Sequence, residues 1–148
     1  MAKVTLSAEV RGAAELVRAC ARMEREAPGT VRDQAAEVAD DLADRIQAAG
    51  RSDTRQSARA AGTVRSTGGF VPQVTAGPHP LLFGSEFGMT RHSGWYAKGR
   101  YYSSPGMQFR PHNGGDGYWF FPTHRANLDW ELEYFAEAID ELLDGWPT

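Results

Sequence analysis

Four histidines and one cysteine have the widest catalytic repertoire in this sequence: His79, His92, His112, His124 and Cys20. No two histidines are spaced as His-x-x-His or His-Glu-x-x-His, the helical spacings that place two imidazoles on one metal ion. Cys20 falls on an apolar helical stripe and shares no motif with a histidine, which predicts an inert buried thiol. The sequence therefore predicts no catalytic group, no metal site, no cofactor and no enzyme. A small hydrolase that uses His112 or His124 is the most remote alternative.

Two further patterns could indicate ligand sites. Gly114–Gly117 is rich in glycine, but it lacks the Gly-Lys-Ser/Thr ending of a phosphate-binding loop. Residues 127–148 hold seven acidic residues and no basic one. These acids spread around the polar arc of a predicted helix rather than converging, which predicts a solvated or partner-facing surface. Glu133, Glu137 and Asp140 represent this acidic helix surface.

The segment from Met89 to Gly117 has no periodicity and is unusually rich in glycine and aromatic residues. Loops of this length in a small domain are commonly functional or disordered. Aromatic and arginine side chains are enriched at protein interfaces, so this segment predicts a subunit or partner interface. Stacking on single-stranded nucleic acid and packing on the domain's own sheet are the alternatives. The candidate interface residues are Trp95, Tyr96, Arg100, Tyr101, Tyr102, Phe109 and Arg110.

The elements that must position these residues indicate an α+β fold. A chain of 148 residues with 41% hydrophobic residues suits one domain, 1–148, with its own core. No apolar run is long enough to span a membrane, and the first residues lack a signal core, which predicts folding in a cytoplasm. The sequence predicts a small antiparallel or mixed sheet, packed by a long N-terminal helical region and a C-terminal helix. The expected elements are a strand at 4–10, a helical region at 13–49, strands at about 63–76 and at 118–122, an extended loop at 89–117 and a helix at 127–144.

The helical region carries a regular apolar stripe. Its second part repeats the stripe at Val31, Ala35, Val38, Leu42 and Ile46. Pro28-Gly29 predicts a kink or short break, with Thr30 as the N-cap of the second part and Gly50 as its end.

The later elements have weaker signals. Arg51 to Gly69 reads as a polar connector that passes into a strand, and Pro72 places the strand over 70–77 at a sheet edge or bulge. The aromatic run 118–122 reads as a last strand. Asn127 is expected to cap the final helix, whose apolar stripe is expected to pack on the sheet. That stripe consists of Leu128, Leu132, Phe135, Ile139, Leu142 and Trp146.

The net charge of −3 is unevenly distributed along the chain. Residues 1–66 are nearly neutral, residues 67–126 are basic and residues 127–148 are strongly acidic. An acidic protein is a poor general nucleic-acid binder, although a nucleic-acid-binding module remains the alternative of another class. We expect the acidic helix to meet a basic counter-surface across a subunit interface, formed by Arg51, Arg55, Arg59 and Arg65.

The order of elements resembles the tail-completion, or head–tail joining, family of long-tailed bacteriophages. Three blocks carry this resemblance. The first block is Asp53-Thr54, after the first helical region. The second is Leu82–Gly88, with Phe83, Glu86 and Gly88. The third, Phe121-Pro122 with Ala126, precedes the last helix. The resemblance covers most of the chain.

This resemblance implies an α+β structural protein of the virion neck without catalytic activity. It also implies a homo-oligomeric ring, for example a hexamer, that contacts the head connector and tail-tube proteins. The ring would have possible non-specific contact with DNA in the lumen and would involve no membrane. Assembly in the host cytoplasm and a final location in the virion neck or tail follow from the same resemblance. The neighbouring role of tail terminator, which caps the tail tube, is the closest alternative.

Overall fold

The computed structural model describes residues 5–9, 28–69, 71–89 and 109–144 of the chain. The predicted α+β class is confirmed: four helices and a small antiparallel sheet make up this part of the chain. In chain order the elements are β1 (Leu6–Glu9), α3 (Pro28–Asp53), α4 (Arg55–Ala61), β2 (Arg65–Thr67), β3 (Gln73–Ala76), α5 (Leu82–Phe87) and α6 (Phe120–Asp144).

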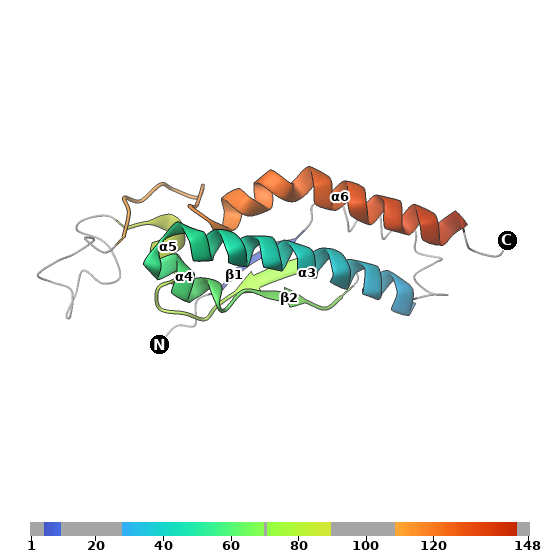
Figure 1. Ribbon diagram of the computed structural model, residues 1–148, viewed down its shortest axis with the longest axis horizontal. Coiled ribbons are helices and arrows are strands. Elements are labelled where there is room, and N and C mark those ends of the chain that lie inside the picture. Colours follow the sequence, from blue (N-terminus) through green and yellow to red (C-terminus); the bar gives the residue numbers. More distant parts are fainter. Residues whose placement is uncertain (1–4, 10–27, 70, 90–108, 145–148) are drawn as a thin grey trace, which may run out of the picture.

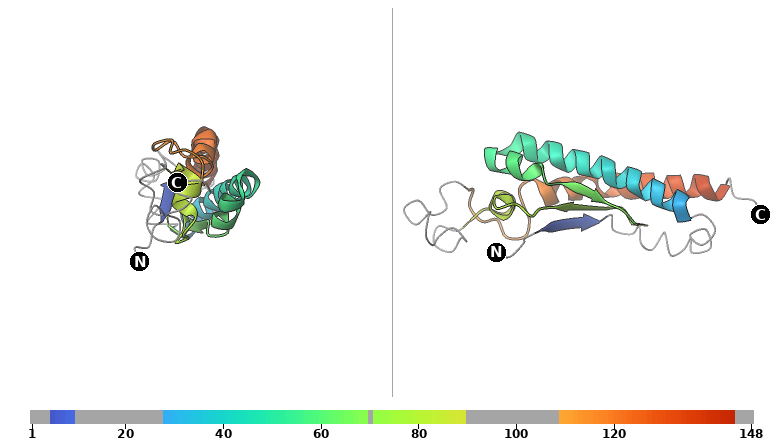
Figure 2. Two further views of the ribbon diagram at one scale, coloured as in Figure 1. Left: turned by 90° about the vertical axis from the view of Figure 1, so that its left-hand side faces the viewer. Right: turned by 90° about the horizontal axis from the view of Figure 1, so that it is seen from below.

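Two long helices dominate the shape of the molecule. Helices α3 and α6 run antiparallel and side by side, and the strands run roughly along them (Figures 1 and 2). Helix α4 and the C-terminal end of α3 therefore lie at the same end of the molecule as the start of α6. The N-terminal half of α3 lies beside the C-terminal half of α6.

The sheet has the strand order β1-β3-β2 with both pairs antiparallel. Leu6 pairs with Ala76 and Ala8 with Val74, and all four side chains are buried on one face. The strand expected over 63–76 is two antiparallel strands, β2 and β3. The expectation that Pro72 marks an edge strand is wrong, because β3 is the central strand and Pro72 precedes its first residue.

The apolar stripe of α3 is confirmed, since Val31, Ala35, Val38, Leu42 and Ile46 are all buried. The predicted boundaries are wrong. Pro28 and Thr30 lie inside α3 and Gly50 does not end it, because the helix continues to Asp53. A proline is tolerated in the first turn of a helix, where its missing N–H has no intrahelical partner. The part of the predicted helical region before Pro28 lies outside the described residues.

The segment after α3, predicted as a polar connector, begins with a helix instead. Thr54 caps α4 by accepting a hydrogen bond from the Ser57 backbone N–H, and the Ser57 side chain accepts one from the Thr54 N–H. Ser57 Oγ also donates to the carbonyl of Gly50 at 2.8 Å, which folds α4 back onto α3. This reciprocal capping starts a short helix whose only buried apolar residues are Ala60 and Ala61.

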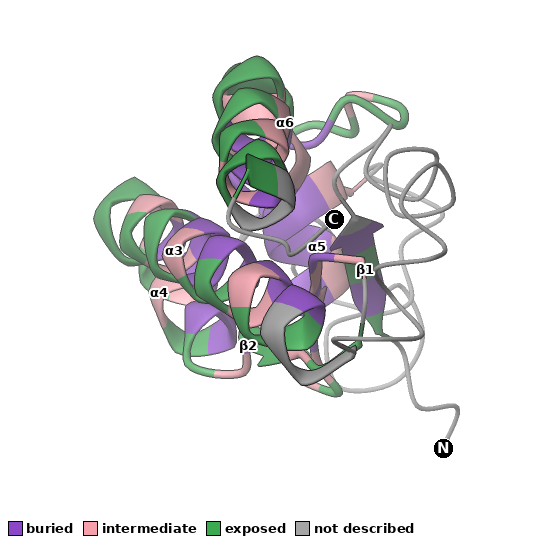
Figure 3. Ribbon diagram, turned by 90° about the vertical axis from the view of Figure 1, so that its right-hand side faces the viewer, coloured by how far each residue is buried: buried purple, intermediate pink, exposed green. Residues whose placement is uncertain are grey.

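The aromatic run 118–122 is not a strand. Helix α6 already begins at Phe120, so Asn127 is an interior residue, and its side chain donates to the Thr123 carbonyl. The apolar stripe of α6 is confirmed at four positions: Phe135 and Ile139 are buried, and Leu128 and Leu132 are partly buried against the core. The side chains of Leu142 and Trp146 lie outside the described part of the chain. The stripe was expected to pack on the sheet, but the main partner of α6 is α3. Buried residues gather where α3, α6 and β1 face one another (Figure 3).

Candidate functional site

The described residues form no cluster of metal-ligating side chains. In the described ranges, no group of three or more His, Cys, Asp or Glu side chains could hold a metal ion. No helix there is long and apolar enough to cross a membrane. The informative features are a buried glutamate that joins two helices and the distribution of exposed charged and aromatic side chains.

Glu86 of α5 is fully buried, and its carboxylate caps the start of α6. Oε2 accepts hydrogen bonds from the backbone N–H groups of Trp119 at 3.0 Å and Phe120 at 2.7 Å, and Oε1 from that of Phe121 at 3.0 Å. These are N–H groups that the first turn of a helix leaves without an intrahelical partner. Burial raises the pKa of Glu86, against the lowering effect of these N–H donors. Glu86 therefore ties α5 to the N-terminus of α6.

The residues around Glu86 explain the rest of the block Leu82–Gly88. A Cβ atom on Gly84 would lie 2.6 Å from the ring of Phe109, and one on Gly88, whose φ is +69°, would collide with the backbone of Pro111. Ser85 Oγ accepts a hydrogen bond from the Trp119 indole at 3.3 Å. The block thus packs directly against Phe109, Pro111 and Trp119.

Two of the predicted interface residues, Phe109 and Arg110, lie within the described residues. Phe109 is buried and only 8% exposed, so the expectation that it is a partner-facing anchor does not fit its position. Arg110 forms a bidentate ion pair with Asp53, at 2.9 and 2.5 Å, and its guanidinium lies 3.7 Å from the ring centroid of Tyr118. The other predicted interface residues of this segment lie outside the described residues: Trp95, Tyr96, Arg100, Tyr101 and Tyr102.

The acidic surface of α6 is exposed at all three predicted positions, Glu133, Glu137 and Asp140. Glu131 departs from the prediction that the acids of this helix lie on its polar arc. It is fully buried, and its Oε2 lies 3.9 Å from Nδ1 of His124, beyond hydrogen-bonding distance. Burial raises the pKa of Glu131 to about 8, with Arg45 lowering it and Asp41 raising it.

An exposed aromatic seam between α3 and α6 was missed by the sequence reasoning. Trp130 and Tyr134 stack with ring centroids 5.5 Å apart and an interplanar angle of 18°, and they are 38% and 36% exposed. The Arg45 guanidinium lies 4.3 Å from the Trp130 centroid, and the Tyr134 hydroxyl donates to Glu37 Oε1 at 2.9 Å. The i, i+4 spacing of two aromatics outside the apolar stripe was the available signal. We call these four residues the aromatic seam.

The four arginines of the predicted basic counter-surface are all exposed. Arg51 lies in the last turn of α3, and Arg55 and Arg59 lie one turn apart on α4. Arg65 is separate from them at the start of β2, where its guanidinium donates to the carbonyls of Gly62 and Val64. The structure therefore brings three of the four arginines together at one end of the molecule.

Charge is separated along the long axis of the molecule. Residues 28–44 of α3 and 133–144 of α6 together carry ten acidic residues and one arginine. These two halves lie side by side, and the three arginines of α3 and α4 lie at the opposite end (Figures 1 and 2). Within the described residues, charge is thus bipolar along the α3–α6 pair.

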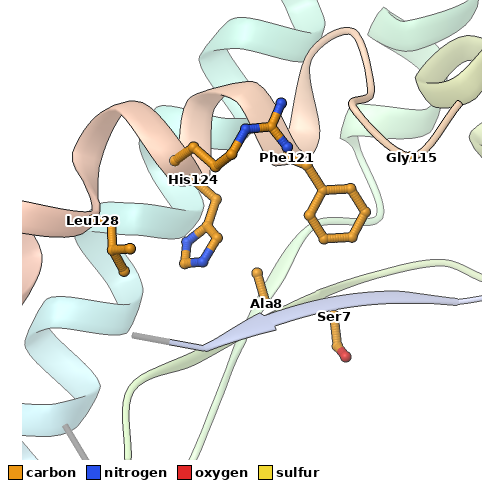
Figure 4. Close-up of a pocket in the computed structure, with 7 residues that line it drawn as sticks. Ser7, Ala8, Gly115, Phe121, His124 and Leu128 are labelled. Carbon is orange, nitrogen blue, oxygen red and sulfur yellow. The ribbon is translucent and has the colours of Figure 1, made fainter. Parts of the chain in front are cut away.

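A cleft of about 540 Å³ separates the first turns of α6 from β1. Phe121, His124 and Leu128 point from α6 toward β1, Ala8 points back at them, and Ser7 points away (Figure 4).

Comparisons with family models, with curated proteins and with solved structures found no match to this chain.

Proposed function

We propose that this chain is a structural protein of the neck of a long-tailed bacteriophage, where it joins or completes the tail at the head–tail interface as a homo-oligomeric ring. The observation that carries the proposal is the bipolar charge of the α3–α6 pair. Two like ends repel each other, whereas the arginine end of one copy is attracted to the acidic half of the next. Repeating such a head-to-tail contact gives a closed ring when the rotation between neighbouring copies is a whole fraction of 360°.

The proposal assigns the protein no catalytic step and no cofactor. Its contacts would be with the head connector, the tail tube and a second copy of itself. Two contacts between distant parts of the chain suit that structural role: Glu86 links α5 to the start of α6, and the Arg110–Asp53 ion pair links the segment before α6 to the end of α3. The resemblance of Asp53-Thr54, Leu82–Gly88 and Phe121-Pro122 to the tail-completion family supports the same assignment.

A direct test combines the purified chain with head-connector and tail-tube subunits and, separately, with duplex DNA. The proposal predicts co-sedimentation with a connector or tail-tube oligomer and only weak, salt-sensitive binding to DNA. Tight DNA binding whose affinity falls steeply with salt, without co-sedimentation, would instead identify a nucleic-acid-binding module that uses Arg51, Arg55 and Arg59.

A further inference from the structure

We infer that the aromatic seam is the docking site for the arginines of α4 of a second copy of this chain. The inference rests on the proposed self-association and names the contact that would produce it. Tyr134 and Glu37 of the seam belong to the acidic halves of α6 and α3, and Trp130 and Arg45 adjoin them, so an exposed pair of rings lies beside negative charge.

Tyr134 lies in a strongly negative environment. The hydrogen bond from its hydroxyl to Glu37 raises the pKa of Tyr134, and the charges of Glu37, Asp41 and Glu141 raise it further. The nearest cation in the seam, Arg45, is already engaged: its Nε donates to Asp41 at 2.7 Å and its Nη1 to Asn127 at 3.0 Å. Asp41 is therefore already paired with Arg45, whereas Glu37 and Glu141 make no ion pair within the described residues and can accept a cation from outside.

The seam already shows how a guanidinium is accepted. Arg45 lies over the Trp130 ring and pairs with a carboxylate of its own helix, so one aromatic ring and one acid hold one arginine. Tyr134 extends this stack along α6, with Glu37 and Glu141 beside it. A second guanidinium placed against Tyr134 would find the same combination of ring face and carboxylate.

The other end of the molecule offers matching groups. Arg51 and Arg55 are exposed and make no hydrogen bond or ion pair in the described part of the chain. Arg59 is also exposed, and its charge lowers the pKa of His79. Arg55 and Arg59 are one helical turn apart, close to the spacing of Trp130 and Tyr134 on α6. This complementarity of charge and spacing favours a second copy as the occupant of the seam.

The test uses two variants, each with one surface disabled. Tyr134→Ala with Glu141→Lys removes the ring and reverses a charge in the seam, and Arg55→Glu with Arg59→Glu reverses the basic end. Sedimentation velocity should show that each variant self-associates more than tenfold more weakly than the wild type. Tyr134→Phe, which keeps the ring, is the matched control and should lose no more than about threefold.

Mixing the two disabled variants gives the sharpest outcome. Each retains the surface that the other has lost, so the mixture should form a 1:1 dimer and nothing larger. If the wild type assembles but the variants assemble equally well, or if the mixture forms no dimer, the docking inference is wrong and the ring proposal survives. If the wild type stays monomeric, both are wrong. If Tyr134→Ala unfolds, the exposed Glu141→Lys change alone is compared with the wild type.

Discussion

Oε2 of Glu86 lies 2.7 Å from the backbone nitrogen of Phe120, the first residue of α6, although the two residues are 34 positions apart. This contact places a carboxylate at the positive end of a 25-residue helix. It also satisfies backbone donors inside the protein, where water cannot reach them. Glu86 thus helps to fix where α6 begins, while the packing of Phe135 and Ile139 into the core holds the helix along α3.

Glu86→Gln should therefore destabilise the fold. The amide retains one acceptor oxygen but presents an NH₂ group to backbone N–H donors, which leaves at least one buried donor unsatisfied. We expect a loss of about 1–3 kcal/mol in the free energy of unfolding, measured by urea denaturation. The exposed Glu133→Gln is the control and should change it by less than about 0.5 kcal/mol. Equal urea midpoints of unfolding for Glu86→Gln and Glu133→Gln would contradict the capping role of Glu86.

A substitution at Gly117 also tests the contact between Glu86 and the start of α6. The φ of Gly117 is +78°, and a Cβ atom there would collide with the Glu86 carboxylate. Gly117→Ala should cost about 1–2 kcal/mol from the backbone conformation alone, and more from the displaced carboxylate. Gly115→Ala, where a Cβ meets no atom within 4 Å, should cost less than about 1 kcal/mol. Thermal melting of the two variants decides this, and a melting temperature of Gly117→Ala as high as that of Gly115→Ala would contradict the prediction.

Glu131 should make stability depend on pH. Its pKa is about 8 in the folded protein and near the ordinary value of 4.5 in the unfolded chain. The folded state therefore binds more protons between these values, and the contribution of Glu131 to stability falls as pH rises from about 5 to 8, by at most about 1.4 kcal/mol per unit. Glu131→Gln removes this dependence. The variant should match the wild type at pH 5 and exceed its unfolding free energy at pH 8; a constant difference across this range would show that Glu131 does not titrate there.

A substitution of Phe109 tests whether this residue of the segment 89–117 is an interface anchor or part of the domain's own core. Because its ring is buried against Gly84, Phe109→Ala should lower the free energy of unfolding by about 3–5 kcal/mol. For the same reason, deleting residues 92–115 should destabilise the domain, since the deletion removes both Phe109 and Arg110. If denaturant unfolding of Phe109→Ala is unchanged while assembly is lost, Phe109 is an interface anchor after all.

Local periodicity was sufficient to predict the buried faces of the long helices. Val38, Leu42 and Ile46 follow the helical repeat, as do Phe135 and Ile139, and all five are buried. The fold class follows from these stripes together with the alternation at Leu6 and Ala8. Such patterns depend only on residues close in sequence.

The errors arose where distant residues decide the structure. The run Tyr118–Pro122 has strand-forming aromatic residues, but the Glu86 carboxylate captures its N–H groups and starts a helix there. Gly50 looks like a helix end, yet its role is close packing: a Cβ would lie 2.7 Å from Ala61 and from the Trp119 ring. Glu131 falls among solvated acids in the sequence, and only the position of α3 shows that it is buried.

The most direct test of the neck-ring proposal is the mass of the intact assembly, measured by native mass spectrometry at low and at high salt. Head-to-tail pairing of the basic and acidic ends predicts one closed oligomer of defined subunit number at low salt, which dissociates toward monomer as salt screens the charges. A monomer at every salt concentration, or an oligomer whose mass and stability are unaffected by salt, would contradict the proposal.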